Sequence, residues 1–412
     1  MRDTLVRRYV EALVPLSTLG LALMPLLGPR AMVFVIIGWM GVLAMRSALD
    51  PSPVGRGAWQ WAGFLAMPFG LMVLDLFRAP DLLQGLHILE RGSALLVFPF
   101  GFLLLGAPSS DRFREAMMDL FSLAALALAA YGNGLTFFDG LPPRLLGEDF
   151  SMVYRAAFAQ HTGLHPPYAS YFFLTGAIFQ LDQVLDRARR PVLRLVAIAL
   201  LVLAGLLIAS RMPLIAFAGG AAAVFLVRMP RRRAWRTALA VFVGVLLLAA
   251  ITPGARERMA EVLALAQKRT DIRSLNSVDI RVPIAHCSLQ RIEENWLLGA
   301  GEAHAQALLD SCYTQFGLPM LLNGSYGTHN QLLHWWLCFG LAGVALYIIY
   351  FGTLLIRAWQ RGDAAHLGFL VLLMLCSTTE NILTRQWGVV LFACFNALFV
   401  AGTEPDRPRS HS

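Results

Sequence analysis

Arginine and histidine side chains mark the places in this sequence where chemistry could occur. Arg281 and His329 belong to the polar stretch 253–330, and Arg211 stands alone between two apolar runs. Guanidinium groups bind phosphate oxygens through two parallel hydrogen bonds and stabilise negative charge on a departing phosphate. An imidazole with an ordinary pKa of about 6.5 is largely neutral at pH 7 and can accept a proton from a hydroxyl. These residue types therefore predict an anion-binding site with a proton acceptor at His329.

The composition places these residues in a membrane protein. Of the 412 residues, 57% are hydrophobic, and the mean hydropathy is +0.60, whereas a soluble domain is usually about 45–50% apolar. A bilayer core requires about 20 apolar residues for each helical span. We therefore predict a single all-α polytopic membrane domain over residues 1–412, with about twelve transmembrane helices. The expected spans are 9–27, 31–48, 58–77, 81–107, 113–134, 167–186, 192–210, 212–228, 235–252, 330–356, 365–383 and 386–402.

The N-terminal segment is interpreted as the first of these spans. It has a basic start, but no small-residue cleavage site follows, so a signal peptide is not expected. The fourth expected span is the weakest, because Glu90 and Arg91 interrupt its apolar run.

Clusters of arginine predict the orientation of the chain. If all of the expected spans exist, these clusters fall on one side of the membrane, which the positive-inside rule identifies as the cytoplasm. The clustered residues are Arg2, Arg7, Arg8, Arg46, Arg56, Arg112, Arg114, Arg187, Arg189, Arg190, Arg194, Arg228 to Arg236, Arg357, Arg361, Arg407 and Arg409. Both termini are then cytoplasmic, and the loops 135–166 and 253–329 face outward. This placement accounts for most of the net charge of +8, so no nucleic-acid partner is expected.

A few arginines lie on the outward side instead. Arg211 and Arg385 depart from the inside bias, and Arg155 and Arg281 lie in the two outward loops. We predict that these four side chains can converge on one outward pocket, where they would bind a phosphate-containing group. For Arg211 the alternative is structural, because an arginine at the end of an apolar helix pair can extend to the membrane interface.

The cysteines and paired histidines give weaker signals. Of the five cysteines, Cys338, Cys376 and Cys394 lie in expected spans and are interpreted as packing residues. Cys287 and Cys312 lie in the outward loop 253–329, where an oxidising compartment would permit a disulfide, and the sequence leaves that bridge open. His161 and His165 have the spacing of metal ligands on a helix, but Gly163 and the prolines after His165 argue against a helix there. No metal or other cofactor is expected.

Helices are expected in the second outward loop as well. Residues 256–269 carry apolar side chains at intervals of three and four, as in an amphipathic helix on a membrane surface. A second helix is expected to begin near Ser277 or Asp279 and to run to about Trp296. Gly299-Ala-Gly301 is interpreted as a turn, because no strand precedes it and the rest of a dinucleotide fingerprint is missing.

Taken together, these motifs resemble the O-antigen ligase and polymerase superfamily. The resemblance covers roughly residues 150–390. It rests on Ser210-Arg211 at a span end, Arg281 before a helix, and the Asn295-Trp-Leu-Leu-Gly-Ala-Gly301 turn. His329-Asn330-Gln-Leu-Leu at the start of a span, followed by Phe339-Gly-Leu-Ala-Gly343, is its most specific part.

The resemblance implies a metal-independent, inverting glycosyltransferase of GT-C-like architecture in the bacterial inner membrane, with a periplasmic active site. Its donor would be a glycan on undecaprenyl pyrophosphate and its acceptor lipid A–core, so membrane lipids surround both. His329 would act as the base or orient the acceptor, and Arg211 and Arg281 would hold the pyrophosphate. Arg155 and Arg385 are further candidates from their position alone.

Other functions stay open. An O-antigen polymerase or a protein O-oligosaccharyltransferase would use the same donor with another acceptor. A transporter of lipid-linked sugars is a third possibility, but it would be expected to show internal repeats and polar residues at mid-span. Here the polar groups lie at the outward span ends.

Overall fold

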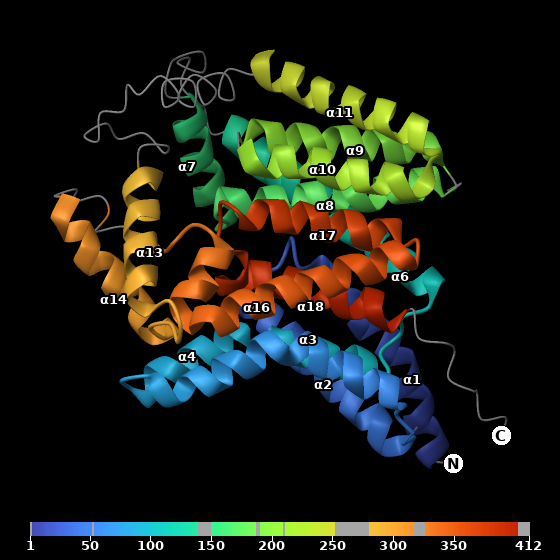
Figure 1. The fold of residues 1–412 in the computed structure, drawn as a ribbon. Coiled ribbons are helices and arrows are strands. Elements are labelled where there is room, and N and C mark those ends of the chain that lie inside the picture. The colour runs from blue at the N-terminus through green and yellow to red at the C-terminus, as the bar shows by residue number, and fades with distance from the viewer. Residues whose placement is uncertain are drawn as a thin grey trace.

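The computed structural model describes residues 2–51, 53–138, 150–186, 190–208, 211–251, 280–316, 321 and 326–402, and every regular element in them is helical (Figure 1). The predicted all-α class is therefore confirmed for this part of the chain. The α-helices are α1 (Arg2–Gly20), α2 (Pro29–Leu49), α3 (Arg56–Asp75), α4 (Leu82–Gly92), α5 (Ala94–Pro99), α6 (Asp111–Phe138), α7 (Phe150–Thr162), α8 (Pro166–Leu185), α9 (Pro191–Leu207), α10 (Arg211–Arg228), α11 (Arg231–Ile251), α13 (Arg281–Asn295), α14 (Glu302–Tyr313), α16 (Gln331–Gln360), α17 (Ala364–Ser377) and α18 (Gln386–Ala401). The short helical turns are η1 (Leu21–Leu23), η2 (Leu76–Arg78), η3 (Phe100–Leu104), η4 (Thr314–Phe316) and η5 (Ile382–Thr384).

Several helices have the length and composition of membrane spans. Four described helical stretches qualify, namely Pro29–Leu49, Arg56–Arg78, Asp111–Phe138 and Gln331–Gln360, and the bent pair of α4 with α5–η3 would make a fifth. Helices α9, α10, α17 and α18 are shorter but apolar. The described part of the chain is thus all-α and carries several helices that could cross a membrane, and the count of about twelve spans stays a prediction.

The buried and exposed helices differ in a way that suits a bilayer. Helices α8 and α18 are buried on almost every face, and the rings of Phe179 and Phe395 meet between them, tilted by 51° and with centroids 4.8 Å apart. By contrast, α2 and α9 leave large apolar side chains exposed, among them Phe34 and Val192 in the part of the chain that the structure describes. Contiguous exposed apolar surface on a helical perimeter is expected where lipid is the solvent.

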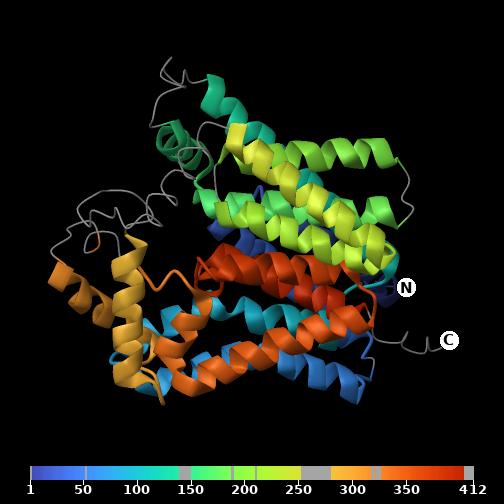
Figure 2. The ribbon, with the colours of Figure 1, turned by 45° about the horizontal axis from the view of Figure 1, so that its top comes forward.

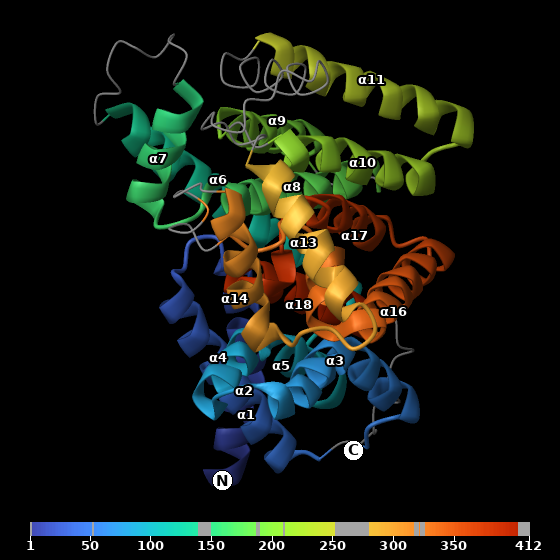
Figure 3. The same cartoon turned by 60° about the vertical axis from the view of Figure 1, so that its left-hand side comes forward.

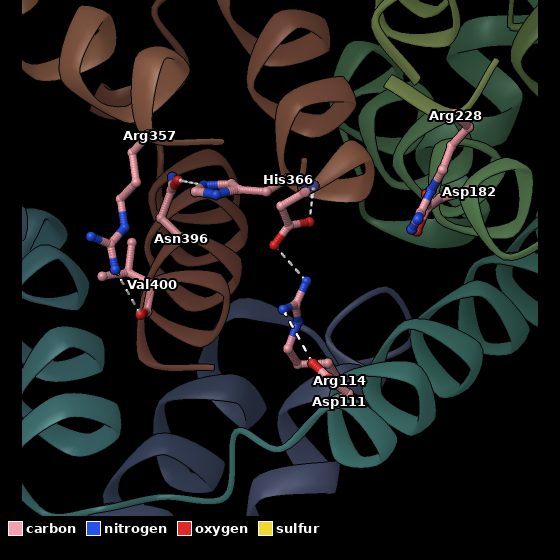
Figure 4. A network of polar contacts seen from close by, with 9 residues as sticks. Asp111, Arg114, Asp182, Arg228, Arg357, His366, Asn396 and Val400 are labelled. Carbon is pink, nitrogen blue, oxygen red and sulfur yellow. Dashed lines mark hydrogen bonds and ion pairs between the residues drawn. The ribbon is translucent and has the colours of Figure 1, made fainter. Parts of the chain in front are cut away.

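The bundle has two chemically different ends. Helix α1 begins and α18 ends at one end, and α13 and α14 lie at the opposite end (Figures 1 and 2). At the first end, arginines pair with carboxylates: Arg114 lies 2.6 Å from Asp363, and Arg228 lies 2.7 Å from Asp182. Figure 4 shows Arg114 and Arg228 in this network. We call the end of the bundle where α1 begins and α18 ends the arginine–carboxylate end.

The fourth expected span, 81–107, is not a single straight helix. It bends by 44° between α4 and the α5–η3 segment. The bend follows from Ser93, whose backbone N–H and hydroxyl both bond to the carbonyl of Glu90, at 3.3 Å and 2.8 Å. A hydroxyl that competes for a helical carbonyl disturbs the regular hydrogen-bond ladder.

The expected span 330–356 also contains an interruption. Within α16, Gly340 has φ 62° and ψ −145°, a conformation that strongly favours glycine. The turn at Gly299–Gly301 lies in this break, where Ala300 N and Gly301 N donate to carbonyls of α16 at 2.7 Å and 2.8 Å. Gly299 and Gly301 also have positive φ, which confirms the predicted turn. The hydrogen bonds show that this turn packs against α16.

The end opposite the arginine–carboxylate end carries helices outside the bundle, as Figure 3 shows for α7, α13 and α14. The second helix expected in the outward loop is confirmed as α13, whereas α14 was not predicted. A disulfide joins Cys287 of α13 to Cys312 of α14, with Cα atoms 5.7 Å apart, which resolves the bridge left open above. The remaining cysteines, Cys338, Cys376 and Cys394, are free and buried.

Some expectations concern parts of the chain that lie outside the described residues. These are the amphipathic helix at 256–269 and the helix start near Ser277 or Asp279. In the first outward loop, α7 was not predicted. It ends at Thr162, one residue before Gly163 with φ 67°, so His161 and His165 do not share a helix, as expected.

Candidate functional site

His329 is held at the start of α16 by a set of side-chain to backbone hydrogen bonds. Asn330 caps the helix by accepting a backbone N–H of the first turn at 3.0 Å, and its amide donates to Thr378 O at 3.1 Å. The side chain of Gln331 accepts Leu383 N at 2.8 Å. These bonds fasten α16 to the segment 378–383, which joins α17 to α18.

The backbone at His329 is itself unusual. Its φ is 48°, in the left-handed region that residues with a β-carbon rarely adopt. Backbone strain of this kind concentrates at functional sites, where surrounding contacts hold it in place. The helix cap at Asn330 and the bonds to segment 378–383 supply such contacts here.

Glu380 lies directly beside this histidine. His329 Nδ1 is 3.4 Å from Glu380 Oε2, and the two side chains are 27% and 17% exposed. The ring of Tyr326 lies near the imidazole, with centroids 5.8 Å apart. His329 is therefore partly accessible and paired with a carboxylate. The sequence analysis assigned no role to Glu380, which sits beside Asn381 in the polar segment between α17 and α18.

The charge state of Glu380 follows from its neighbours. Burial alone would raise the pKa of this carboxyl, but the hydrogen bond and charge of His329, together with the charges of His165 and Arg281, hold the pKa below its ordinary value of 4.5. Glu380 is therefore ionised at neutral pH. The charges of Arg281 and His165 show that α13 and the segment before α8 contribute to the same site as His329.

His165, immediately before α8, belongs to this site too. The protein packed around its ring lowers the pKa of His165 below 6.5, Glu380 opposes that change, and the cations Arg155 and Arg385 with His329 lower it further. The residue nevertheless keeps solvent exposure. It is therefore neutral at pH 7. The sequence analysis had considered His165 only as a possible metal ligand.

Arg155 reaches the site from α7, which packs on α6 and α8. The hydroxyl of Tyr154 donates to the side chain of Asn133 on α6, and the ring of Phe158 meets Phe173 of α8 with centroids 6.4 Å apart. These contacts orient α7, and Arg155 between them is partly buried.

Arg281 and Arg385 occupy helix starts. Arg281 is the first residue of α13 and Arg385 directly precedes α18, and both are exposed. Within the described residues, neither guanidinium forms an ion pair with a carboxylate. They remain able to bind an anion.

The backbone of Arg211 can also be placed. A β-carbon on Gly219 would lie 2.5 Å from the side chain of Leu375, and one on Gly368 would lie 2.6 Å from Val224. Helices α10 and α17 are therefore antiparallel, and α10 begins beside the end of α17 from which the chain continues to Glu380. The side chain of Arg211 lies outside the described part of the structure.

The structure thus brings three of the predicted arginines, Arg155, Arg281 and Arg385, into one electrostatic site with His329. Several cations around one histidine–carboxylate pair can bind a multiply charged anion and accept a proton beside it. Among the described residues, no three histidine, cysteine or acidic side chains are grouped so that they could hold a metal ion. The roles of these residues stay predictions.

A second histidine–carboxylate pair lies five residues further along α16. His334 Nε2 is 3.9 Å from Glu302 Oε1, and these side chains are only 12% and 10% exposed. Asp75 accepts Glu302 N at 2.7 Å, and Arg78 donates to Leu298 O at 2.9 Å. This pair lies where α3 and η2 hold the start of α14 and the turn before it.

Comparison with known proteins bears on the central part of the chain. Residues 196–348 match the family model described as O-Antigen ligase, and no curated protein matches the chain. The matched stretch includes Arg211, Arg281 and His329, and it also includes the turn that lies in the break of α16. The resemblance found from the motifs is therefore confirmed for this central part of the chain, which is similar to the O-antigen ligase family.

Proposed function

We propose that this chain is an inverting, metal-independent glycosyltransferase. It moves an O-antigen polysaccharide from undecaprenyl pyrophosphate to a sugar hydroxyl of lipid A–core. The match of residues 196–348 to the O-antigen ligase family model supports this class of donor and acceptor. The observation that carries the proposal is the His329–Glu380 pair, partly accessible and surrounded by Arg155, Arg281 and Arg385.

In this proposal the site faces the periplasm of a bacterial inner membrane, and both termini are cytoplasmic. About twelve spans would give that topology. The proposal draws support from the two ends of the bundle. The arginine–carboxylate end has the basic character of a cytoplasmic face, whereas α13 and α14 at the opposite end carry a disulfide, which an oxidising compartment permits.

The chemistry follows from the residues of the site. The acceptor hydroxyl gives its proton to the imidazole of His329 while its oxygen forms a bond to the anomeric carbon of the donor sugar. The bond from that carbon to the pyrophosphate oxygen breaks, and its electron pair leaves with the pyrophosphate. Attack from the face opposite the leaving group inverts the configuration. General-base catalysis of this type contributes typically about 10²–10⁴-fold.

The arginines stabilise the negative charge of the departing pyrophosphate. One charge pair at about 4 Å, in an effective dielectric of about 20, is worth roughly 4 kcal/mol before desolvation is counted. Arg211 and Arg281 are assigned to the pyrophosphate, with Arg155 and Arg385 as further cations. Two or three such contacts can supply the stabilisation that a divalent metal ion supplies in other phosphate-releasing enzymes.

A reconstituted assay tests the acceptor. The purified chain is given lipid-linked glycan together with lipid A–core, a second lipid-linked glycan, or a protein acceptor, each in a separate reaction. The proposal expects transfer to lipid A–core alone. Chain extension of the second lipid-linked glycan would identify a polymerase, and glycosylation of the protein an O-oligosaccharyltransferase. Movement of the lipid-linked glycan across a vesicle membrane without any product would identify a transporter.

A further inference from the structure

We propose that Glu380 is the positioning residue for His329: it holds the imidazole with Nδ1 as the hydrogen-bond donor, so that Nε2 is left to accept the proton of the acceptor hydroxyl. This inference rests on the proposed function, since it assigns a second residue to the same proton-transfer step. The sequence motifs did not suggest it. The juxtaposition of Glu380 with His329 in the structure does.

The pair is built into a fixed part of the fold. The segment that carries Glu380 is fastened to the start of α16 before and after that residue. Asn330 binds Thr378 O at 3.1 Å, and the hydroxyl of Thr328 lies 3.1 Å from the side chain of Asn381. Because Glu380 and His329 come from segments that are hydrogen-bonded to each other, the carboxylate and the imidazole are held next to each other.

The choice of nitrogen follows from hydrogen-bond chemistry. A neutral imidazole has one donor and one acceptor nitrogen, and an ionised carboxylate can only accept. Glu380 Oε2 lies 3.4 Å from Nδ1 of His329, so the tautomer with the proton on Nδ1 is favoured. The remaining nitrogen, Nε2, is then the proton acceptor. A carboxylate that orients a functional histidine through its second nitrogen is a recurring arrangement.

The charge balance of the site supports a specific role for this carboxylate. Arg155 from α7, Arg281 from α13, Arg385 before α18 and neutral His165 before α8 surround the pair. If the site served only to bind pyrophosphate, a negative charge among these cations would repel the ligand. An ionised Glu380 weakens anion binding, and its contact with His329 gives that carboxylate a function in proton transfer.

The experiment compares Glu380→Gln, Glu380→Asp and wild type in the reconstituted transfer assay, with kcat, the donor KM and the pH profile of kcat/KM measured for each. Glu380→Gln is expected to lower kcat by about 10- to 100-fold, with the donor KM unchanged or lower. The acid limb of its profile should move to lower pH, because the charge that favours protonated imidazole is gone. Glu380→Asp should recover part of kcat, since it restores the charge.

Glu294→Gln is the matched control, because Glu294 is a carboxylate at the protein surface that pairs with Arg291 at 2.8 Å; it should behave as wild type. Thermal unfolding and gel filtration confirm that each variant is folded. A folded Glu380→Gln protein with the kcat and the acid limb of wild type would overturn the positioning role. His329→Ala, assayed in parallel, distinguishes failure of the positioning role of Glu380 from failure of the proposed function. If that variant transfers glycan normally, the proposed function of His329 fails as well.

Discussion

Two histidine–carboxylate pairs at the start of α16 have opposite environments. His329 and Glu380 are partly accessible, and arginines from several elements surround them. His334 and Glu302 are nearly buried, and their surroundings are a second carboxylate, Asp75, and the start of α14. The residue types are the same, and the two histidines are only five residues apart in the chain.

The difference shows what turns such a pair into a candidate active site. Near the His334–Glu302 pair, Asp75 accepts Glu302 N, and Arg78 pairs with Asp75 at 3.4 Å and donates to the carbonyls of Leu298 and Gly299, so this cation is already engaged within the protein. At His329 the cations Arg281 and Arg385 form no ion pair within the described residues. Access to solvent and cations that can still bind a ligand, rather than the histidine itself, distinguish the candidate functional pair.

The difference between the two pairs is tested most strongly by removing the histidine of the accessible pair. His329→Ala should lower transfer by about 10²–10⁴-fold, because the proton acceptor is lost. The thermal unfolding midpoint should stay close to that of wild type. Initial rates of product formation by the purified protein provide the measurement. Wild-type rates in the variant would remove His329 from the mechanism.

Substituting Arg281 should give the next largest effect. Arg281→Ala is expected to reduce transfer by about 10²-fold or more, since removal of one charge-stabilising contact typically costs that much. Arg281→Lys should recover little, because lysine lacks the planar fork that matches phosphate. Arg291 of the same helix is a matched control: it binds Glu294 and Leu308 O, so Arg291→Lys should leave kcat within about 3-fold, a difference of less than 1 kcal/mol. Equal losses in both variants would contradict a specific role for Arg281.

Removing the disulfide probes how α13 is held. The Cys287–Cys312 bridge closes a loop with a sequence separation of 25, for which the loss is about 3 kcal/mol of stability in the chain-entropy view. The double Cys→Ser variant should show earlier unfolding or proteolysis of the α13–α14 region. Addition of reductant to wild type should reproduce the effect. No change in proteolysis would mean that the contacts of α14 with α16 suffice.

The buried pair should respond differently from the accessible one. His334→Ala leaves the carboxylate of Glu302 without its partner, a change that costs about 1–3 kcal/mol for a buried group. We expect a lower unfolding midpoint with kcat per folded molecule within about 3-fold of wild type. Calorimetry and active-site titration separate the two quantities. A large loss of kcat in fully folded protein would erase the distinction between the pairs.

The smallest expected effect is a pH dependence from His165. Its pKa is lowered below 6.5 in the folded state, so the unfolded state binds the proton more readily. Its contribution to stability is therefore full above about pH 6.5 and declines as the pH falls below that value. His165→Gln should reduce the slope of unfolding free energy against pH in this window. An identical slope in the variant would remove His165 as its source.

Several residues of the candidate site could be selected from the sequence, because residue type and position relative to the expected spans are informative. Arg155, Arg281, Arg385 and His329 were selected that way, and the structure brings them together. Their convergence depends on how α7, α13 and α16 pack, which no local pattern encodes.

Glu380 was missed for a related reason. A single carboxylate near a span end can have many roles. Only the distance of 3.4 Å between Glu380 and His329 indicates a specific role for this one. The break of α16 at Gly340 could not be predicted from the sequence either. The turn at Gly299–Gly301, which lies 39 to 41 residues earlier in the chain, packs into that break. Apolar composition predicted the span but not its interruption.

The central claim is that guanidinium groups beside one imidazole replace a metal ion in the transfer reaction. The most direct test is the initial rate of transfer by the purified wild-type chain, with lipid-linked glycan and lipid A–core, in the presence and absence of EDTA. The account predicts equal rates. Loss of transfer with EDTA, restored by adding a divalent metal ion, would contradict it.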